Sequence, residues 1–320
     1  MPQRAGLEAR LARLEAARLA AEEIGARLRE MPGCADAEVS EVLKHKRGEH
    51  AVLAATIGGE AVIVKWFAGP KAARIVRRQQ RELTFAAAHL GQGPYQVNRS
   101  LMAFPDAGLA VLSFAPGERL RDHLAQADPE RRAALLQRAG GWLKAYCAPR
   151  LECPEYAPGR WIERMAATDL SHLGPQDAAL MERLKAATAA RGAAAKGVHA
   201  WLAPGHSDFV DLNMLWDGRV LTGVDIQGEN RQLLARMSAR FLVWLTLRGD
   251  REPTTRIHGL DRGDVQAFLQ SDVLSENEKA RLLPVFIGEQ LFARFVQEFH
   301  AQSKRRANAV AAINGYLAGD

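Results

Sequence analysis

The chain has 320 residues and a formal net charge of +6 at pH 7. That length is enough to bury a sizeable core in one large domain or in two lobes. No stretch approaches about 20 uninterrupted apolar residues, and the first residues lack an apolar core, so the sequence predicts neither a transmembrane helix nor a secretory signal. The three cysteines lack metal-ligand spacing, which indicates free thiols in a cytoplasmic protein.

The N-terminal residues predict a long helix. Between residues 5 and 31, Leu and Ile recur at a mostly helical spacing among Ala, Arg and Glu, and Pro32-Gly33 ends the pattern. Residues 1–33 are therefore expected to form a helical arm. Packing on the domain that follows is the favoured role, and pairing with a second copy or lying on a membrane surface are the alternatives.

Residues 34–116 predict a small antiparallel domain. Gly58-Gly59 is a tight hairpin signal between two alternating apolar runs. A helix over residues 71–90 is expected between the third and fourth strands. The expected strands are 39–43, 51–57, 61–67, 97–104 and 110–114.

From residue 117 onward the chain is predicted to be mainly helical. One hairpin interrupts the helices, because the turn Asp217-Gly218 separates Met214–Trp216 from Val220–Val224. The fold class is therefore α+β, with a five-stranded antiparallel lobe, a larger helical lobe over 117–320 and an extra N-terminal helix. The expected helices lie near 119–126, 129–147, 160–169, 176–191, 230–249, 262–270, 276–300 and 303–317.

The most informative stretch is the run from His206 to Asn213, which reads His-Ser-Asp-Phe-Val-Asp-Leu-Asn and is followed by Asp225 after an apolar strand. One carboxylate can accept the proton of an attacking hydroxyl, and an Asn with a later Asp can hold Mg²⁺ against nucleotide phosphates. Alone, Asp208 would indicate a turn-capping residue. Together with Asn213 and Asp225 at these spacings, Asp208 is interpreted as catalytic and the other two as Mg²⁺ ligands.

These residues resemble the catalytic core of the protein-kinase-like superfamily. The nearest likeness is to its small-molecule branch, the aminoglycoside phosphotransferase and choline kinase-like enzymes. That branch commonly has His-Gly-Asp where this chain has His206-Ser207-Asp208, followed by an Asn five residues after the Asp. The resemblance implies a bilobal fold with a nucleotide-binding lobe over 34–116 and a C-terminal lobe that holds the catalytic loop and the acceptor.

The resemblance extends to a candidate phosphate-binding pair. Lys65, at the end of Ala61-Val62-Ile63-Val64-Lys65, matches the strand lysine that contacts the α- and β-phosphates. Strand alternation puts Lys65 on an apolar face, where a lysine must be paired or reach a ligand. Glu82, inside the predicted helix, occupies the position of the ion-pair glutamate of the family.

Further contacts follow from the same resemblance. The segment Val111–Gly117 resembles the strand and hinge that hold adenine, which implies ATP contacts at Ser113 and Ala115. Gly48 stands where the family has its Gly-rich loop. His206 is expected to hold the catalytic loop by hydrogen bonds rather than to take part in proton transfer.

Two departures from the family pattern leave alternatives open. Asp225 is followed by Ile226-Gln227-Gly228, without a second acidic metal ligand, and Gly48 is the sole glycine of the expected loop. A pseudokinase-type nucleotide-binding or interaction module is therefore one alternative. The run Val224-Asp225-Ile226-Gln227 has some likeness to bacterial lipopolysaccharide sugar kinases, because basic residues follow it, so a glycan acceptor is another. These residues are Arg231, Arg236 and Arg240.

The predicted function is ATP- and Mg²⁺-dependent transfer of the γ-phosphate to a hydroxyl of a small molecule. The charge of +6 argues mildly against a polycationic acceptor. It makes an anionic acceptor or peripheral contact with an anionic membrane plausible, and no nucleic-acid partner is expected. The helical region that would select the acceptor carries no motif that identifies it.

Overall fold

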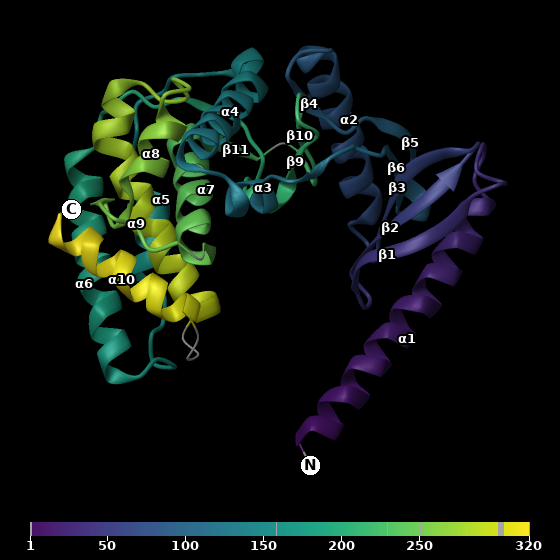
Figure 1. The fold of residues 1–320 in the computed structure, drawn as a ribbon, viewed down its shortest axis with the longest axis horizontal. Coiled ribbons are helices and arrows are strands. Elements are labelled where there is room, and N and C mark those ends of the chain that lie inside the picture. The colour runs from purple at the N-terminus through teal and green to yellow at the C-terminus, as the bar shows by residue number, and fades with distance from the viewer. Residues whose placement is uncertain (1, 158, 229, 250, 300–303, 320) are drawn as a thin grey trace. The chain divides into compact units, whose positions relative to one another are not determined.

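The computed structural model describes residues 2–157, 159–228, 230–249, 251–299 and 304–319. The chain forms two compact units. Figure 1 shows a β-sheet in the first unit and mainly helices in the second. The first unit comprises Met1–Gly91, Val97–Pro116 and Ile226–Gly228, and the second comprises Gln92–Gln96, Gly117–Asp225 and Glu229–Asp320.

The first unit contains the expected five-stranded antiparallel sheet, in the order β1-β2-β3-β6-β5. Side chains of β2 alternate between buried and partly exposed positions, as a strand with one core-facing side requires. One helix, α2 (Ala72–Leu90), follows the third strand, as predicted. The strands are β1 (Glu38–Lys46), β2 (His50–Ile57), β3 (Glu60–Phe67), β5 (Ser100–Phe104) and β6 (Leu109–Ser113).

The predicted N-terminal helix is present as α1 (Pro2–Arg29). Its C-terminal part packs on the sheet, since Ile24 and Leu28 are buried in the core of the first unit. Leu11, Leu14 and Leu19 are exposed, although they share the helical spacing. The expected packing therefore holds for the last turns of the helix and not for these three leucines.

The single strand predicted over 97–104 is wrong, because the structure divides it into β4 (Tyr95–Val97) and β5. β4 belongs to a four-stranded sheet in the order β4-β10-β9-β7, and the nearby Pro94 oxygen accepts a hydrogen bond from the Leu221 amide. Apolar periodicity identifies an extended segment but not its partner, so the change of sheet left no signal in the pattern.

The second unit is built from helices that pack around an aromatic core. Phe209 stacks on Trp142 with ring centroids 5.8 Å apart and on Phe241 at 5.0 Å, and Phe241 stacks on Phe268 at 5.3 Å. This row of rings anchors the segment that begins at His206. The helices are α3 (Leu120–Gln126), α4 (Pro129–Cys147), α5 (Gly159–Ala166), α6 (Pro175–Ala194), α7 (Leu234–Arg248), α8 (Arg262–Leu269), α9 (Leu283–Arg294) and α10 (Lys304–Ala318).

Local sequence explains the clearest helix boundary in this unit. α4 begins at Pro129 because the Asp128 side chain accepts a hydrogen bond from the Arg131 amide and proline suits the first helical position. Its observed bounds equal the predicted ones.

Other boundaries differ from the prediction. The helix expected over 276–300 consists of α9 with a π-helical segment on each side, Glu278–Leu282 and Phe295–Phe299. Its expected end at 300 and the expected start of the next helix at 303 lie outside the described residues. Among the described residues, no helix is both long and apolar enough to cross a membrane.

Several short strands complete the second unit. The predicted hairpin is confirmed as β9 (Met214–Trp216) and β10 (Leu221–Gly223). A pair that periodicity did not predict forms between β8 (Leu202–Pro204) and β11 (Arg231–Leu233), which delays the start of α7 to Leu234. The remaining strands are β7 (Glu118–Arg119), β12 (Arg256–Ile257) and β13 (Leu260–Asp261).

Candidate active site

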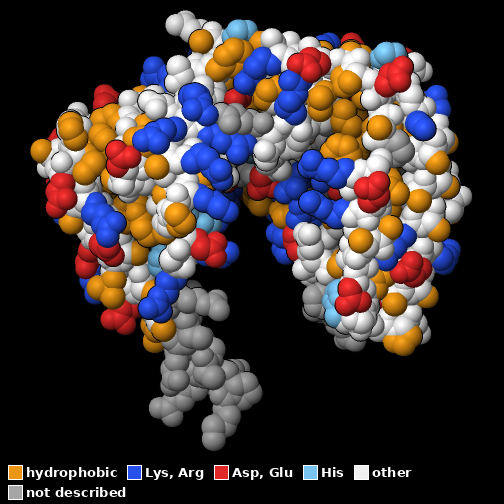
Figure 2. Space-filling model, turned by 180° about the vertical axis from the view of Figure 1, so that it is seen from behind, with side chains coloured by type: hydrophobic (Ala, Val, Ile, Leu, Met, Phe, Trp, Pro, Cys, Tyr) orange, Lys and Arg blue, Asp and Glu red, His pale blue; other side chains and the backbone are white. Residues whose placement is uncertain are grey.

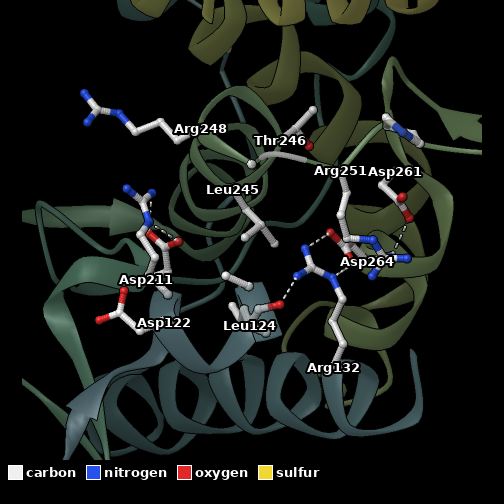
Figure 3. Close-up of a pocket in the computed structure, with 14 residues that line it drawn as sticks. Asp122, Leu124, Arg132, Asp211, Leu245, Thr246, Arg248, Arg251, Asp261 and Asp264 are labelled. Atoms are coloured by element: carbon white, nitrogen blue, oxygen red, sulfur yellow. Dashed lines mark hydrogen bonds and ion pairs between the residues drawn. The ribbon is translucent and has the colours of Figure 1, made fainter. Parts of the chain in front are cut away.

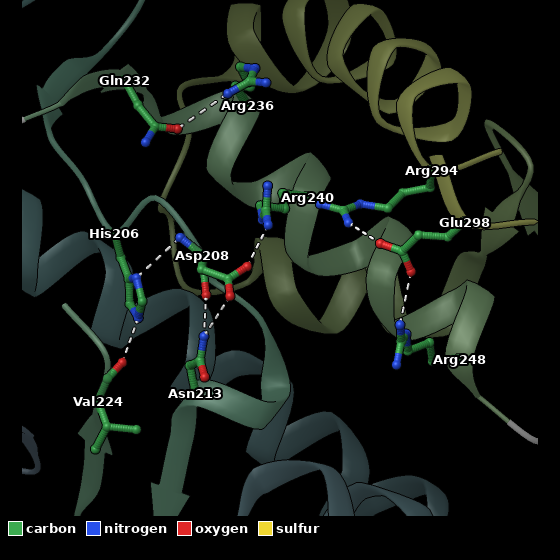
Figure 4. Close-up of polar contacts among 10 residues, drawn as sticks. All are labelled: His206, Asp208, Asn213, Val224, Gln232, Arg236, Arg240, Arg248, Arg294 and Glu298. Atoms are coloured by element: carbon green, nitrogen blue, oxygen red, sulfur yellow. Dashed lines mark hydrogen bonds and ion pairs between the residues drawn. The ribbon is translucent and has the colours of Figure 1, made fainter. Parts of the chain in front are cut away.

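His206 ties the segment that contains Asp208 to the hairpin. Its imidazole is 1% exposed. Its Nε2 lies 2.9 Å from the Val224 carbonyl oxygen, and its Nδ1 lies 3.3 Å from the Asp208 amide nitrogen. A neutral ring that donates from Nε2 and accepts at Nδ1 satisfies both contacts. The imidazole thus fixes the backbone of Asp208 relative to the end of β10 (Figure 4).

Asn213 and Arg240 hold the carboxylate of Asp208 from two directions. The Asn213 side-chain amide donates to the Asp208 backbone oxygen at 2.8 Å and to Oδ2 at 3.1 Å. The guanidinium of Arg240, on α7, donates to Oδ1. The Asp208 side chain is nevertheless 49% exposed, so a substrate hydroxyl can reach it.

Asp225 has a left-handed backbone, with φ of 61°. This conformation is costly for most residues with a side chain, and aspartate tolerates it better than most. The Val224 amide donates to the Asn213 backbone oxygen at 2.9 Å, so Asn213 and Asp225 are held on adjacent segments. Strained backbone of this kind concentrates at functional sites.

The donor set of Asn213 and Asp225 fits Mg²⁺. One amide oxygen and one carboxylate are oxygen ligands, and Mg²⁺ keeps several waters instead of demanding a complete protein cage. The described residues contain no group of three or more His, Cys, Asp or Glu side chains placed to hold a metal. The pair would therefore share the ion with waters and phosphate oxygens.

Asp211 is engaged by an arginine within the second unit. Both of its oxygens accept from Arg121 on α3, at distances of 3.0 and 3.1 Å. Burial raises the pKa of Asp211, and Arg121 acts in the opposite direction. The pair links the loop to α3, which gives Asp211 a structural role.

A cavity of about 300 Å³ lies beside this pair. Figure 3 shows Asp211, Asp122 and Arg248 on its walls, with the ion pair between Arg132 and Asp264 opposite. Arg132 donates to Asp264 at 2.6 and 2.7 Å. The cavity is therefore lined by charges of both signs, most of them already paired.

The first unit contains the two predicted phosphate-site residues. Lys65 lies on β3 and is 5% exposed, and Glu82 lies on α2 and is 2% exposed. Charged side chains are rarely buried this deeply without a compensating partner. Their burial in elements that pack on each other suits a paired role.

The segment after Asp225 packs on the same helix. The Gln79 side chain donates to the Ile226 oxygen at 2.8 Å, and Arg78 donates to the Gly228 oxygen. Gly228 has φ of 72°, and a Cβ there would lie 2.7 Å from the Cβ of Glu82. Glycine is thus required at 228 both by its backbone and by the closeness of Glu82.

The three predicted adenine and loop contacts have different environments. Gly48, with φ of 69°, forms the turn between β1 and β2. The Ser113 hydroxyl accepts from the Arg99 amide at 2.8 Å, so it is engaged within the first unit. Ala115 is buried near the end of the unit at Pro116.

Sequence reasoning did not predict that Arg240 contacts Asp208. It noted Arg236 and Arg240 as part of an Arg-rich stretch. A signal was present in the spacing of four residues, which places both on one face of α7. Which residue that face meets depends on how α7 packs, and the spacing alone does not contain that information.

Comparisons of sequence found no relatives, whereas comparison of structure did. No family model matches the chain, and no curated protein matches it. Solved kinase structures resemble it over most of its length. An amicoumacin kinase, hAmiN, in complex with AMP-PNP, Ca²⁺ and Ami has a TM-score of 0.56 and 13% identity, covering 87% of this chain and 88% of that chain.

Two further structures agree. A thermostable aminoglycoside phosphotransferase APH(4)-Ia, in a ternary complex with AMP-PNP and hygromycin B, has a TM-score of 0.56 and 14% identity, covering 92% of this chain and 98% of that one. A choline/ethanolamine kinase family protein from Mesorhizobium loti has a TM-score of 0.54 and 14% identity, covering 93% of each chain. At these identities the likeness establishes the fold. The chain therefore has the protein-kinase-like fold of the small-molecule kinases, as the sequence motifs predicted.

Proposed function

We propose that the protein is an ATP- and Mg²⁺-dependent phosphotransferase that transfers the γ-phosphate to a hydroxyl group of a small molecule. The observation that supports this most directly is the hydrogen-bonded set of His206, Asp208 and Asn213, next to the left-handed Asp225. Structures with this fold include kinases crystallised with nucleotide analogues.

In this proposal each residue of the second unit has a distinct task. Asp208 orients the acceptor hydroxyl and takes its proton, a role that needs position more than strong basicity because the transition state is loose. Asn213 fixes the carboxylate through its amide nitrogen, and its amide oxygen and Asp225 bind Mg²⁺. The bound ion supplies neutralisation of the charge on the phosphates.

The first unit would bind the nucleotide. Lys65 contacts the α- and β-phosphates, and Glu82 orients Lys65 by pairing with it. Backbone groups near Ser113 and Ala115 bind adenine, and the turn at Gly48 approaches the phosphates. Since Ser113 uses its hydroxyl within the protein, adenine recognition there would depend on the main chain.

The test of this function separates nucleotide binding from transfer. Asp208→Asn keeps the size of the side chain and removes its charge, so Mg·ATP binding should be retained. Hydrolysis of ATP, with water as acceptor, should fall by about 100-fold or more because positioning and proton acceptance are lost. Calorimetric titration and a single-turnover assay measure the two quantities.

The outcome of that test decides the catalytic assignment. An Asp208→Asn protein that hydrolyses ATP at the wild-type rate would remove Asp208 from the chemistry. Arg183→Gln, a change at an exposed position on α6, controls for the preparation and should behave as wild type.

A nucleotide-binding module without transfer activity is the second candidate. It is favoured by the three residues after Asp225, Ile226–Gly228, which include no second acid. The Ile226 and Gly228 oxygens are bound by side chains of α2. A thermal shift with Mg·ATP, combined with no hydrolysis and no transfer to sugars, amino sugars or sugar phosphates, would support this candidate over the first.

A further inference from the structure

Four arginines form a cluster next to Asp208, composed of Arg236, Arg240 and Arg248 on α7 and Arg294 at the end of α9. Figure 4 shows the guanidinium of Arg240 directed at Asp208 and that of Arg294 extending toward Arg240. Figure 2 shows Lys and Arg side chains gathered on the surface of the helical unit.

In the part of the chain that the structure describes, the carboxylates bonded to this arginine cluster do not balance its charge. Arg236 donates to both oxygens of Glu289, at 3.1 and 2.8 Å. Arg248 and Arg294 share the single carboxylate of Glu298, at 2.9 and 2.5 Å.

The carboxylate bonded to Arg240 is Asp208, the candidate catalytic residue. Among the described residues, the four guanidinium groups are therefore bonded to three carboxylates, Glu289, Glu298 and Asp208, which leaves one positive charge in excess within this set.

Burial makes this excess charge significant. The side chains of Arg240 and Arg294 are 21% and 11% exposed. Burial lowers the pKa of the Arg240 guanidinium, Asp208 opposes the shift, and the nearby charge of Arg294 adds to it. A cation held away from water without full compensation is costly, and a bound anion would remove that cost.

Aromatic rings contact three of the four guanidinium groups of the cluster. The guanidinium carbon of Arg248 lies 3.9 Å from the centre of the Trp244 ring, and that of Arg294 lies 5.0 Å from it. That of Arg236 lies 5.7 Å from the Trp161 ring. Cation–π contacts hold the planar groups in place. Arg248 also lines the cavity beside Asp211, whereas Arg240 and Arg294 are not among the residues that line it.

We propose that the acceptor carries an anionic group, a phosphate or a carboxylate, which Arg240 and Arg294 bind while its hydroxyl meets Asp208. The inference rests on the proposed function, because only a phosphotransferase has an acceptor. Binding of the anion takes Arg240 away from Asp208 and so frees the carboxylate for the hydroxyl. A polycationic acceptor would instead meet an excess of like charge.

The experiment titrates wild-type protein, saturated with Mg·AMP-PNP, with glucose 6-phosphate, glucose or glucosamine, and separately with inorganic phosphate. Glucose 6-phosphate should bind at least about 10-fold more tightly than the two unphosphorylated sugars. Arg240→Gln and Arg294→Gln should each weaken phosphate binding by about 10-fold or more, and Arg183→Gln should leave it unchanged. Calorimetry measures all these affinities.

A second pair of variants serves as a control for loss of folding. Arg240→Lys and Arg294→Lys keep the charge but lose the two-pronged donor geometry, so they should retain more phosphate affinity than the glutamine variants. Equal affinity of wild type and all four variants would overturn the proposal. So would tighter binding of glucosamine than of glucose 6-phosphate.

The design separates this inference from the proposed function. If Mg·AMP-PNP fails to bind, the kinase proposal is refuted. Titration with phosphate in the absence of nucleotide still tests whether the arginine cluster binds an anion. If AMP-PNP displaces the phosphate that depends on Arg240, the cluster belongs to the nucleotide and the acceptor inference is overturned.

A last arm distinguishes two sources of the anion. Vesicles containing phosphatidylglycerol are compared with soluble phosphate at equal phosphate concentration. Sedimentation that depends on Arg240 and Arg294 would identify a lipid-linked group, and binding of soluble phosphate alone would identify a free metabolite. Either result supports the anionic class, whereas binding of neither overturns it.

Discussion

At the scale of single residues, the site depends on a few side chains that restrain one another. Asp208 is held by a neutral amide on one oxygen and a guanidinium on the other, and its backbone is held by His206. Asp225 adds a backbone conformation that few side chains accept. Each restraint can be removed separately, which makes the assignments testable one at a time.

Asp225 combines a proposed metal role with a backbone requirement, and two variants separate them. Asp225→Asn keeps the tolerance for the left-handed conformation and should fold as well as wild type, yet lose Mg²⁺-dependent ATP binding. Asp225→Ala should lose the same binding and about 1 kcal/mol of stability in addition. Calorimetry with Mg²⁺ or EDTA, and urea unfolding, measure both effects. Wild-type Mg·ATP affinity in either variant would refute the metal assignment.

The contribution of Arg121 to the free energy of unfolding should depend on pH. Arg121→Gln leaves the Asp211 carboxylate buried without its cation, at a cost of about 2 kcal/mol at neutral pH. Burial raises the pKa of Asp211, and loss of Arg121 raises it further. When the pKa of an acid is higher in the folded protein than in the unfolded chain, ionisation of that acid lowers the free energy of unfolding. This cost is absent below the unfolded pKa and grows as the pH rises through the folded pKa.

The deficit of Arg121→Gln relative to wild type should therefore be small near pH 4 and largest at neutral pH. Urea unfolding of both proteins at several pH values measures it. Adding Asp211→Asn to the variant should recover part of the loss, because no buried charge then remains. A deficit that is the same at all pH values would contradict the explanation.

At the scale of elements, the hairpin of β9 and β10 lies between the two proposed metal ligands, Asn213 and Asp225. Asp217 closes its turn by accepting hydrogen bonds from the Arg219 and Val220 amides, at 2.8 and 2.7 Å. These bonds lower the pKa of Asp217, Val220 contributing most. The hairpin was predictable because the turn residues Asp217-Gly218 act locally. The pairing of β8 with β11 was not, because its strands are distant in sequence and only three residues long.

The turn can be weakened without touching the site. Asp217→Ala removes both acceptor bonds and should lower the free energy of unfolding by about 1 kcal/mol. Asp217→Asn retains an acceptor oxygen and should cost less. Mg·ATP affinity should change little in either variant, since the ligands lie at the other end of the hairpin. An Asp217→Ala protein as stable as wild type would show that the turn does not need its cap.

At the scale of the whole molecule, the fold divides into a sheet unit and a helical unit with separate cores. The first contains buried Lys65 and Glu82, and the second contains Asp208 and Asn213. Anything that binds the native protein and not the unfolded chain adds to stability by mass action. Nucleotide binding should therefore be visible as stabilisation of the folded protein.

Mg·AMP-PNP at 100 times its dissociation constant should raise the free energy of unfolding by about 2.7 kcal/mol. Removal of the metal with EDTA should abolish most of that gain, because Asn213 and Asp225 then lack the ion that links them to the phosphates. Lys65→Ala should reduce the gain as well. Denaturant unfolding with and without ligand measures it, and an absent gain at saturating nucleotide would refute the nucleotide proposal.

The sequence by itself determined the parts that depend on local chemistry. It contained the five strands of the first sheet, the helix after the third of them, the bounds of α4, the hairpin turn and the spacing of Asp208, Asn213 and Asp225, because periodicity, capping and turn residues act over a few positions. Tertiary structure alone decided that β4 leaves the sheet, that Leu11 and Leu14 stay exposed, and that Arg240 meets Asp208. These features depend on which surfaces pack together, and such contacts join residues too far apart in the chain to leave a local pattern.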